Sequence, residues 1–212
     1  MTVRSGRSAG RQWSTTEQTR AQFLDAARIV FAQRGFAEAS VSEVVERAGA
    51  SVGSLYHHFG GKGELFTALW ERYRDEQHAV AARAVAAARA EGVTDPFALF
   101  EAGARAYLEA TWANRDMVKL VHDGDTPPGF QKLLRRSSKA WVRDNFRLLG
   151  ASNSPVNRVL VALLTSFMGD ARREIASARS AKEAQQLVDT MMEVLGRMRV
   201  VIESDLLADA PR

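Results

Sequence analysis

Hydrophobic residues recur along most of this chain at intervals of three and four positions, the spacing of one face of an α-helix. No segment alternates polar and apolar residues with a period of two, the pattern of a half-buried β-strand. The pattern therefore predicts an all-α fold of about nine helices, separated by short segments with glycine, proline or capping residues.

Capping signals bound the first two predicted helices. The first is expected to end near Arg34, because Gly35 suits the left-handed backbone that follows many helices. Ser40 and Glu43 have the spacing of a capping box and begin the second helix. Gly49 then ends it.

Breaks of glycine and proline separate the helices that follow. The segment 123–129 contains aspartate, proline and glycine and is predicted to be a loop. The remaining helices are expected at about residues 52–58, 62–90, 96–112, 114–122, 130–149, 155–178 and 181–207.

The second and third predicted helices have two distinct faces. Hydrophobic side chains three and four positions apart form the inward face, namely Val44, Val45, Ala48, Leu55 and Phe59. The outward face carries Ser51, Gly53, Ser54, Tyr56 and His57. A helix that exposes short hydrogen-bonding side chains and aromatic rings beside basic residues favours contact with the major groove of DNA.

Composition and charge narrow the classes of function. The hydrophobic fraction of 46% excludes a chain that is disordered throughout. The formal net charge of +4 is too small to indicate nucleic-acid binding by itself. Residues 1–13, however, carry Arg4, Arg7 and Arg11 and no acidic residue. We expect a mobile arm here, and two interpretations stay open: incidental charge, or contact with DNA phosphates or the minor groove.

Several kinds of site are excluded or disfavoured. The chain has no cysteine, which excludes disulfides, zinc–thiolate sites and cysteine nucleophiles. No apolar run is long enough to cross a membrane, and the first residues lack the apolar segment of a signal peptide, so a cytoplasmic location is expected. His122, Asp123 and Asp125 are candidate metal ligands, but they stand alone in a proline-rich loop, so we favour no metal and no cofactor. No arrangement of nucleophile and base indicates an enzyme.

Residues 27–66 resemble the DNA-binding domain of the TetR/AcrR family of transcriptional regulators. The resemblance is carried by Phe31, Gly35-Phe36, Ala48-Gly49, the run of residues 53–59 and Lys62. It covers about residues 16–75 and implies a dimeric repressor that leaves its operator when a small molecule binds. It also implies three parts: an arm at 1–15, a helix-turn-helix domain at 16–75 and a ligand-binding and dimerisation domain at 76–212.

The resemblance implies particular DNA contacts, since the second helix of a helix-turn-helix enters the major groove. Gly53 allows close approach of the backbone, Ser54 and His57 are candidates for base edges, and Val52 for a thymine methyl. The expected phosphate contacts are Ser42, Ser51, Tyr56 and Lys62. Valine at position 52 departs from the family, which often has lysine or arginine there, so the arginines of residues 1–13 are expected to compensate.

A largely apolar pocket is expected among the middle helices, although each aromatic residue there also suits an ordinary core. Trp112 and Trp141 are the strongest candidates because a buried indole N–H needs a partner. Arg105 either faces the pocket or extends its stem along apolar surface. The full predicted set is Phe100, Arg105, Tyr107, Trp112, His122, Trp141 and Phe167.

The last two helices, at 155–178 and 181–207, carry apolar stripes with several methionines. The stripes suit a four-helix interface between two subunits, and core packing within one subunit is the alternative. A transcriptional activator or architectural DNA-binding protein shares the same DNA-binding end, and an all-α enzyme is a more distant alternative.

Overall fold

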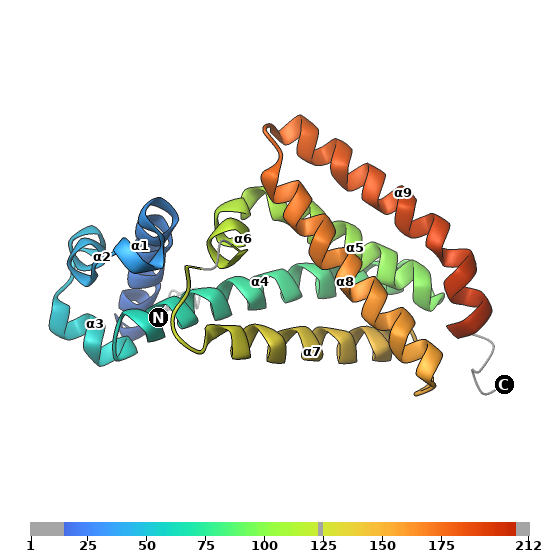
Figure 1. The fold of residues 1–212 in the computed structure, drawn as a ribbon, viewed down its shortest axis with the longest axis horizontal. Helices are drawn as coiled ribbons and strands as arrows, with labels where there is room; N and C mark the ends of the chain where they lie inside the picture. The colour runs from blue at the N-terminus through green and yellow to red at the C-terminus, as the bar shows by residue number, and fades with distance from the viewer. Residues whose placement is uncertain (1–14, 123–124, 207–212) are drawn as a thin grey trace, which may run out of the picture.

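The computed structural model describes residues 15–122 and 125–206, and this part of the chain is all-α (Figure 1). It confirms the predicted fold class and forms nine helices within those ranges. Their bounds are α1 Thr15–Glu38, α2 Val41–Ala48, α3 Val52–Phe59, α4 Lys62–Ala90, α5 Pro96–Ala113, α6 Arg115–His122, α7 Phe130–Leu148, α8 Pro155–Ser177 and α9 Ala181–Leu206.

Helices α1, α2 and α3 form one end of the elongated molecule (Figure 1). The predicted capping box begins α2: the Ser40 hydroxyl accepts from the Glu43 amide, and the Glu43 carboxylate accepts from the Ser40 amide. Gly49 ends α2 with φ 63° and ψ 35°, a left-handed conformation in which glycine has no steric cost. A tight turn therefore joins α2 to α3.

The end of α1 differs from its prediction. Gly35 does have a positive φ (76°), but helical residues resume after it and α1 extends to Glu38 across this break. The Asp125 carboxylate lies where a Gly35 side chain would be and accepts a hydrogen bond from the Ala37 amide at 3.0 Å. The loop that follows α6 therefore packs directly on the end of α1.

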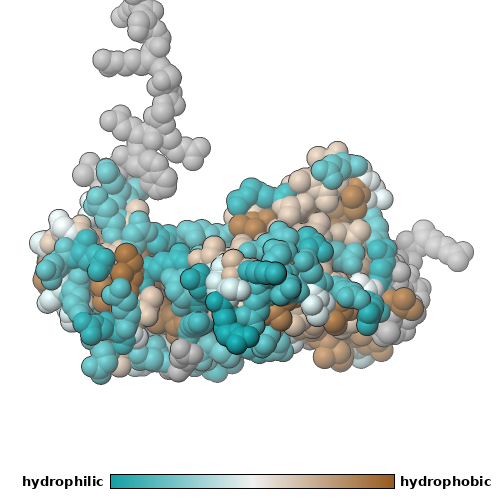
Figure 2. Space-filling model, turned by 90° about the horizontal axis from the view of Figure 1, so that it is seen from above, coloured by the Kyte–Doolittle hydropathy of each residue, from teal (hydrophilic) through white to brown (hydrophobic). Residues whose placement is uncertain are grey.

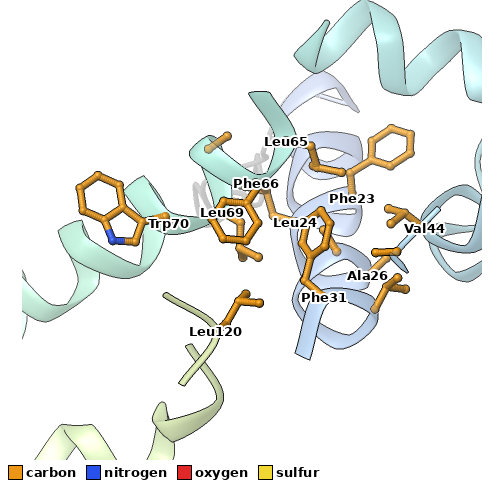
Figure 3. Packing of buried hydrophobic residues seen from close by; sticks show 14 of the residues in the cluster. Phe23, Leu24, Ala26, Phe31, Val44, Leu65, Phe66, Leu69, Trp70 and Leu120 are labelled. Atoms are coloured by element: carbon orange, nitrogen blue, oxygen red, sulfur yellow. The ribbon is translucent and has the colours of Figure 1, made fainter. Parts of the chain in front are cut away.

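A first hydrophobic core joins α1, α2 and α3 to the start of α4. Phe66 projects from α4 toward Leu24 and Phe31 of α1, and Leu120 of α6 approaches the same cluster (Figure 3). Phe31 and Phe66 are both almost fully buried, with ring centres 5.3 Å apart. Because α6 shares this core, the N-terminal helices are attached to the rest of the molecule through two elements, α4 and α6.

A second hydrophobic core lies among α5, α8 and α9, where Leu108, Leu164 and Leu195 are fully buried. Helices α8 and α9 run antiparallel beside each other, α7 packs on α8, and α4 packs along α5 (Figure 1). The predicted domain boundary at residues 75 and 76 falls inside α4, which is continuous from one part to the other. None of the helices within the described ranges is long and apolar enough to cross a membrane.

Candidate functional site

Helix α3 has a buried side and an exposed side. Leu55 and Phe59 are buried against the first core, as their spacing predicts. On the other side Val52 is 45% exposed and Tyr56 is 52% exposed, although both are large and apolar. Gly53 and His57 are exposed beside them. Of the outward face expected from the sequence, Ser51, Gly53, Tyr56 and His57 are therefore exposed, and Ser54 is partly exposed.

Packing within the protein does not require glycine at position 53. Its backbone is helical, and a Cβ atom added there would meet no other atom within 4 Å. Gly53 lies in the first turn of α3, and glycine loses more conformational freedom than alanine when it becomes helical. Close approach of another molecule to this backbone is a reason to keep it, which agrees with the expected approach to DNA.

The serines proposed as DNA contacts differ in their surroundings. Ser42 is exposed on α2. Ser51 caps α3, because its hydroxyl accepts a hydrogen bond from the Ser54 amide at 3.2 Å. The Ser51 hydroxyl hydrogen is still available to an acceptor such as a phosphate. Ser54 itself is only partly exposed.

Lys62 corrects one expectation. Its ammonium donates to the carbonyl oxygens of Phe36 at 2.8 Å, Ala37 at 3.0 Å and Ala39 at 2.9 Å. It also lies 4.6 Å from the centre of the Phe36 ring. A lysine ammonium has three donors, and all three are used here. Lys62 therefore holds the segment between α1 and α2 instead of facing outward as a phosphate contact.

Other cations lie near α3. Arg20 of α1 is exposed and lies 4.5 Å from the centre of the Phe59 ring, and Arg47 is exposed in the last turn of α2. The sequence analysis missed both, because the proximity of Arg20 to α3 depends on the tertiary fold. The predicted contacts Arg4, Arg7 and Arg11 lie outside the described residues.

A cavity of about 990 Å³ lies between α4, α5, α6, α7 and α8. Its apolar lining includes Trp70, Val85 and Met168. Four of the seven predicted pocket residues line it: Phe100, Tyr107, His122 and Trp141. The centre of the Trp141 ring lies 4.1 Å from that of His78 and 5.3 Å from that of Tyr107.

Three predicted pocket residues lie elsewhere. Arg105 faces α9, where it donates to Asp189 at 3.2 Å. Trp112 packs against the second core beneath the guanidinium of Arg115, 4.2 Å from the ring centre. Phe167 also packs against that core. Their positions on α5 and α8 turn these side chains away from the cavity.

The cavity contains polar side chains that the sequence analysis did not identify. Tyr73 and Gln77 of α4 are buried there, and His78 of α4 and Arg172 of α8 are partly buried beside them. Burial raises the pKa of Tyr73 to about 12. Burial also lowers the pKa of His78, and the positive charge of Arg74 lowers it further. The helical spacing could have identified Arg172 from the sequence. It lies four positions after Met168, so the two side chains share one side of α8.

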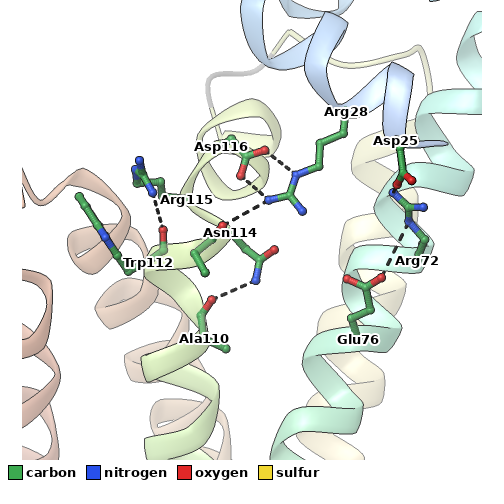
Figure 4. Close-up of polar contacts among 10 residues, drawn as sticks. Asp25, Arg28, Arg72, Glu76, Ala110, Trp112, Asn114, Arg115 and Asp116 are labelled. Carbon is green, nitrogen blue, oxygen red and sulfur yellow. Dashed lines mark hydrogen bonds and ion pairs between the residues drawn. The ribbon is translucent and has the colours of Figure 1, made fainter. Parts of the chain in front are cut away.

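Two ion pairs connect α1 to the elements that line the cavity (Figure 4). Arg28 of α1 contacts both carboxylate oxygens of Asp116 on α6, each at 2.6 Å. Burial favours the neutral form of Asp116, but the hydrogen bond and charge of Arg28 outweigh it, and the pKa of Asp116 is lowered. Arg72 of α4 contacts Asp25 of α1 at 2.9 Å. A smaller cavity of about 590 Å³ lies beside Arg28 and Asp116.

Helices α8 and α9 leave hydrophobic side chains exposed. Val156, Val159 and Leu163 are each more than half exposed and, at spacings of three and four, share one side of α8. Val194 and Val200 are exposed on α9. Hydrophobic surface gathers at the end of the molecule formed by the C-terminal helices, whereas the end with α1 to α3 is mostly hydrophilic (Figure 2).

Two of the candidate metal ligands, His122 and Asp125, lie within the described residues and have other surroundings. His122 lines the large cavity, and the Asp125 carboxylate is bound to the Ala37 amide. Asp123 lies outside the described residues. Within the described residues, no three histidine, aspartate or glutamate side chains are grouped to hold a metal ion.

Comparison with known proteins places this arrangement in context. A family model described as bacterial regulatory proteins, tetR family, matches residues 23–69. The chain is 38% identical over 80 residues to the HTH-type transcriptional regulator TtgR of Pseudomonas putida, covering 38% of this chain and 36% of TtgR. It is 43% identical over 51 residues to the HTH-type transcriptional repressor AcnR of Corynebacterium glutamicum, covering 24% of this chain and 27% of AcnR. The likeness to these regulators therefore spans only about a third or less of their length.

A solved structure extends the likeness to the whole fold. A TetR-family transcriptional regulator from Pectobacterium atrosepticum superposes with a TM-score of 0.59 and 25% sequence identity. The alignment covers 95% of this chain and all of that one. The C-terminal helices thus follow the same architecture, although the curated relatives above match this chain over 80 residues at most.

Proposed function

The chain belongs to the tetR family of bacterial regulatory proteins, and from this premise we propose that it is a ligand-responsive transcriptional repressor. In this proposal two copies bind a near-palindromic operator through α3. A small molecule in the cavity of about 990 Å³ then releases the operator. In this proposal residues 16–75 bind DNA, and residues 76–212 bind the second subunit and, together with Trp70, Tyr73 and Arg74 of α4, the ligand.

The observation that carries the proposal is the course of α4. This helix begins at Lys62, three residues after the end of α3, and continues without a break to Ala90. From Trp70 to Arg89 the same helix lines the cavity. A ligand that changes the position of α4 therefore also changes the position of α3, because the two helices share the first core.

The outward face of α3 supports the DNA-binding part. We assign the approach of the DNA backbone to Gly53, base contacts to Ser54 and His57, and a thymine methyl contact to Val52. Ser42, Ser51 and Tyr56 are assigned to phosphates, together with Arg4, Arg7 and Arg11 of the N-terminal residues. The exposed Arg20 and Arg47 join this set, and Lys62 leaves it.

The exposed hydrophobic side of α8 supports a homodimer. Val156, Val159 and Leu163 would be covered if α8 and α9 packed against the same pair of helices from a second copy. Burial of apolar area of this kind contributes about 25 cal/mol per Å². A symmetric pair also presents two copies of α3 to one duplex, as a near-palindrome requires.

Release requires that the ligand bind more tightly to the conformation that does not fit the operator, since equal affinity for both conformations shifts nothing. The connections available for this change are α4 and the Arg28–Asp116 pair between α1 and α6. The tetR-family relatives are regulators and not enzymes, and we propose no catalytic activity.

The proposal is tested by selecting bound DNA from a random pool with the purified protein. We expect enrichment of a near-palindrome with two half-sites. The selected sequence placed upstream of a reporter should then reduce expression when the protein is present. Lack of any enriched sequence would contradict the DNA-binding assignment, and increased expression would favour an activator.

A further inference from the structure

Unpartnered polar atoms are concentrated in the large cavity. Among the described residues, five buried side-chain nitrogen or oxygen atoms have no hydrogen-bond partner, and four of them belong to residues that line this cavity. These four are the Tyr73 hydroxyl, Gln77 Oε1, His78 Nε2 and Arg172 Nε. A buried polar atom without a partner costs about 1–3 kcal/mol, so four at one place indicate that a polar ligand completes them.

Arg172 supplies a positive charge to this group without a compensating carboxylate. No ion pair of the described residues includes Arg172. Its neighbour Arg173 is paired with Asp170, and Arg74 of the facing helix is paired with Asp75 at 2.8 Å. An uncompensated guanidinium in a cavity is a strong site for an anion, especially a planar one such as a carboxylate.

The neighbours of Arg172 are phenols. Burial by itself lowers the pKa of Arg172, but the side chains of Tyr107 and Tyr73 outweigh it and the pKa is raised, so the guanidinium stays charged. Because burial raises the pKa of Tyr73 to about 12, this phenol keeps its proton at neutral pH and can donate it in a hydrogen bond. The lowered pKa of His78 keeps its imidazole neutral at the same pH. The group therefore offers one positive charge with the Arg172 Nε–H and the Tyr73 hydroxyl as donors, and Gln77 Oε1 as an acceptor.

The acidic residue in the cavity wall is already paired. Asp144 of α7 lies 3.4 Å from Arg147 and 3.9 Å from Arg143. The negative charge of Asp144 favours a higher pKa for His78, but burial lowers that pKa by more. Asp144 therefore does not supply the carboxylate that Arg172 lacks.

The rest of the cavity suits an apolar body. Trp141 packs against His78 and Tyr107, and Phe100 and Val85 continue the lining. A volume of about 990 Å³ is at the upper end of the range for small-molecule pockets. A ligand that fits both the polar group around Arg172 and the apolar lining is anionic at one end and apolar along the remainder.

We propose that the effector of this regulator is an amphipathic organic carboxylate, whose carboxylate binds Arg172 and the Tyr73 hydroxyl and whose apolar body lies against Trp141 and Phe100. This inference rests on the proposed ligand-responsive function and changes the largely apolar effector that the sequence suggested.

The test compares pairs of probes that differ only at the polar end: 4-phenylbutanoate and octanoate, each against its own primary amide. Isothermal titration calorimetry with the full chain near neutral pH gives the four affinities. We expect each carboxylate to bind about tenfold more tightly than its amide, because it forms charge-assisted hydrogen bonds with the guanidinium.

Two adjacent arginines provide a variant and a matched control. In Arg172→Gln the ratio of carboxylate to amide affinity should fall close to unity, and Arg172→Lys should restore part of it. Arg173→Gln removes the same charge from the cavity wall, but at a side chain paired with Asp170, and should leave the ratio unchanged. Circular dichroism confirms that each variant is folded.

The proposal is overturned if the amides bind as tightly as the carboxylates, if Arg172→Gln keeps the wild-type ratio, or if no carboxylate binds at millimolar concentration. The function proposed above fails in a different way. A carboxylate that binds through Arg172 but leaves operator affinity unchanged contradicts ligand-responsive release and leaves the anion site intact.

Discussion

At the scale of single residues, Gly53 and Lys62 have different roles: Gly53 belongs to the exposed face of α3, and Lys62 stabilises the fold. Gly53 lies on the exposed face of α3 with open space around it, so the fold does not require glycine there. Lys62 lies at the start of α4 with its ammonium bound to three carbonyl oxygens, so the fold uses all of its donors. The two residues therefore predict opposite outcomes when they are replaced.

Replacing Gly53 with alanine should separate stability from DNA binding. We expect the free energy of unfolding to rise by up to about 1 kcal/mol, because alanine is the better helix former. Operator affinity should fall, since the added methyl group obstructs the backbone of the duplex. Chemical denaturation and fluorescence anisotropy measure the two effects. Gly169→Ala, in an open helical position of α8, is the control and should leave operator affinity unchanged.

Replacing Lys62 with methionine should reduce stability by about 1–3 kcal/mol, because three carbonyl oxygens lose a charged donor. The dependence of operator affinity on salt should keep its slope if Lys62 touches no phosphate. Lys139→Met, an exposed lysine of α7, serves as the control for stability. A flatter salt dependence for Lys62→Met alone would return Lys62 to the phosphate contacts.

The sequence predicted the two faces of α3 because burial there follows local helical spacing. It did not predict the position of the Lys62 ammonium, since the carbonyl groups of residues 36–39 approach it only in the folded chain. For the same reason it assigned Arg105 to the pocket and overlooked Arg172. Both arginines lie on long helices, and only the packing of α5, α8 and α9 decides which side chain meets the cavity.

At the scale of elements, α4 and α6 form two separate connections between the DNA-binding end and the cavity. The sequence placed all nine helices within a few residues of their observed bounds, because capping boxes and glycine breaks act locally. It did not indicate that α6 and the Asp125 loop pack on α1, because these contacts join residues far apart in the chain.

The Arg28–Asp116 pair gives a prediction at this scale. In Asp116→Asn we expect the factor by which a cavity ligand weakens operator binding to fall several-fold, because α6 is then held less firmly to α1. Operator titrations with and without 4-phenylbutanoate measure this factor. Glu193→Gln breaks an exposed ion pair within α9 and should leave the factor unchanged. An unchanged factor in Asp116→Asn would assign communication to α4 alone.

The same pair predicts a dependence on pH. Because the pKa of Asp116 is lowered in the folded protein, its ion pair contributes stability at neutral pH. That contribution is lost only as the pH falls through the lowered pKa, below the ordinary value of 3.8. The wild-type protein should therefore lose more stability than Asp116→Asn on acidification, as measured by thermal unfolding.

At the scale of the whole molecule, the exposed side of α8 is the proposed subunit interface and the outward face of α3 is the proposed DNA contact. Leu163→Glu should disrupt the proposed subunit interface, because it places a charge among exposed hydrophobic side chains that would be covered. We expect the mass measured by light scattering to fall from two chains to one. Gln33→Glu adds the same charge on α1 and should remain dimeric. A wild-type mass of one chain at micromolar concentration would contradict the interface.

Footprinting of the selected operator, combined with titration of its stoichiometry, tests the central claim most directly. The account predicts two chains per site and two protected segments of the major groove, with centres about 10 base pairs apart. Gly53→Ala should weaken both segments together. Protection of a single segment by one chain, or protection that is unaffected by changes on the outward face of α3, would contradict the account.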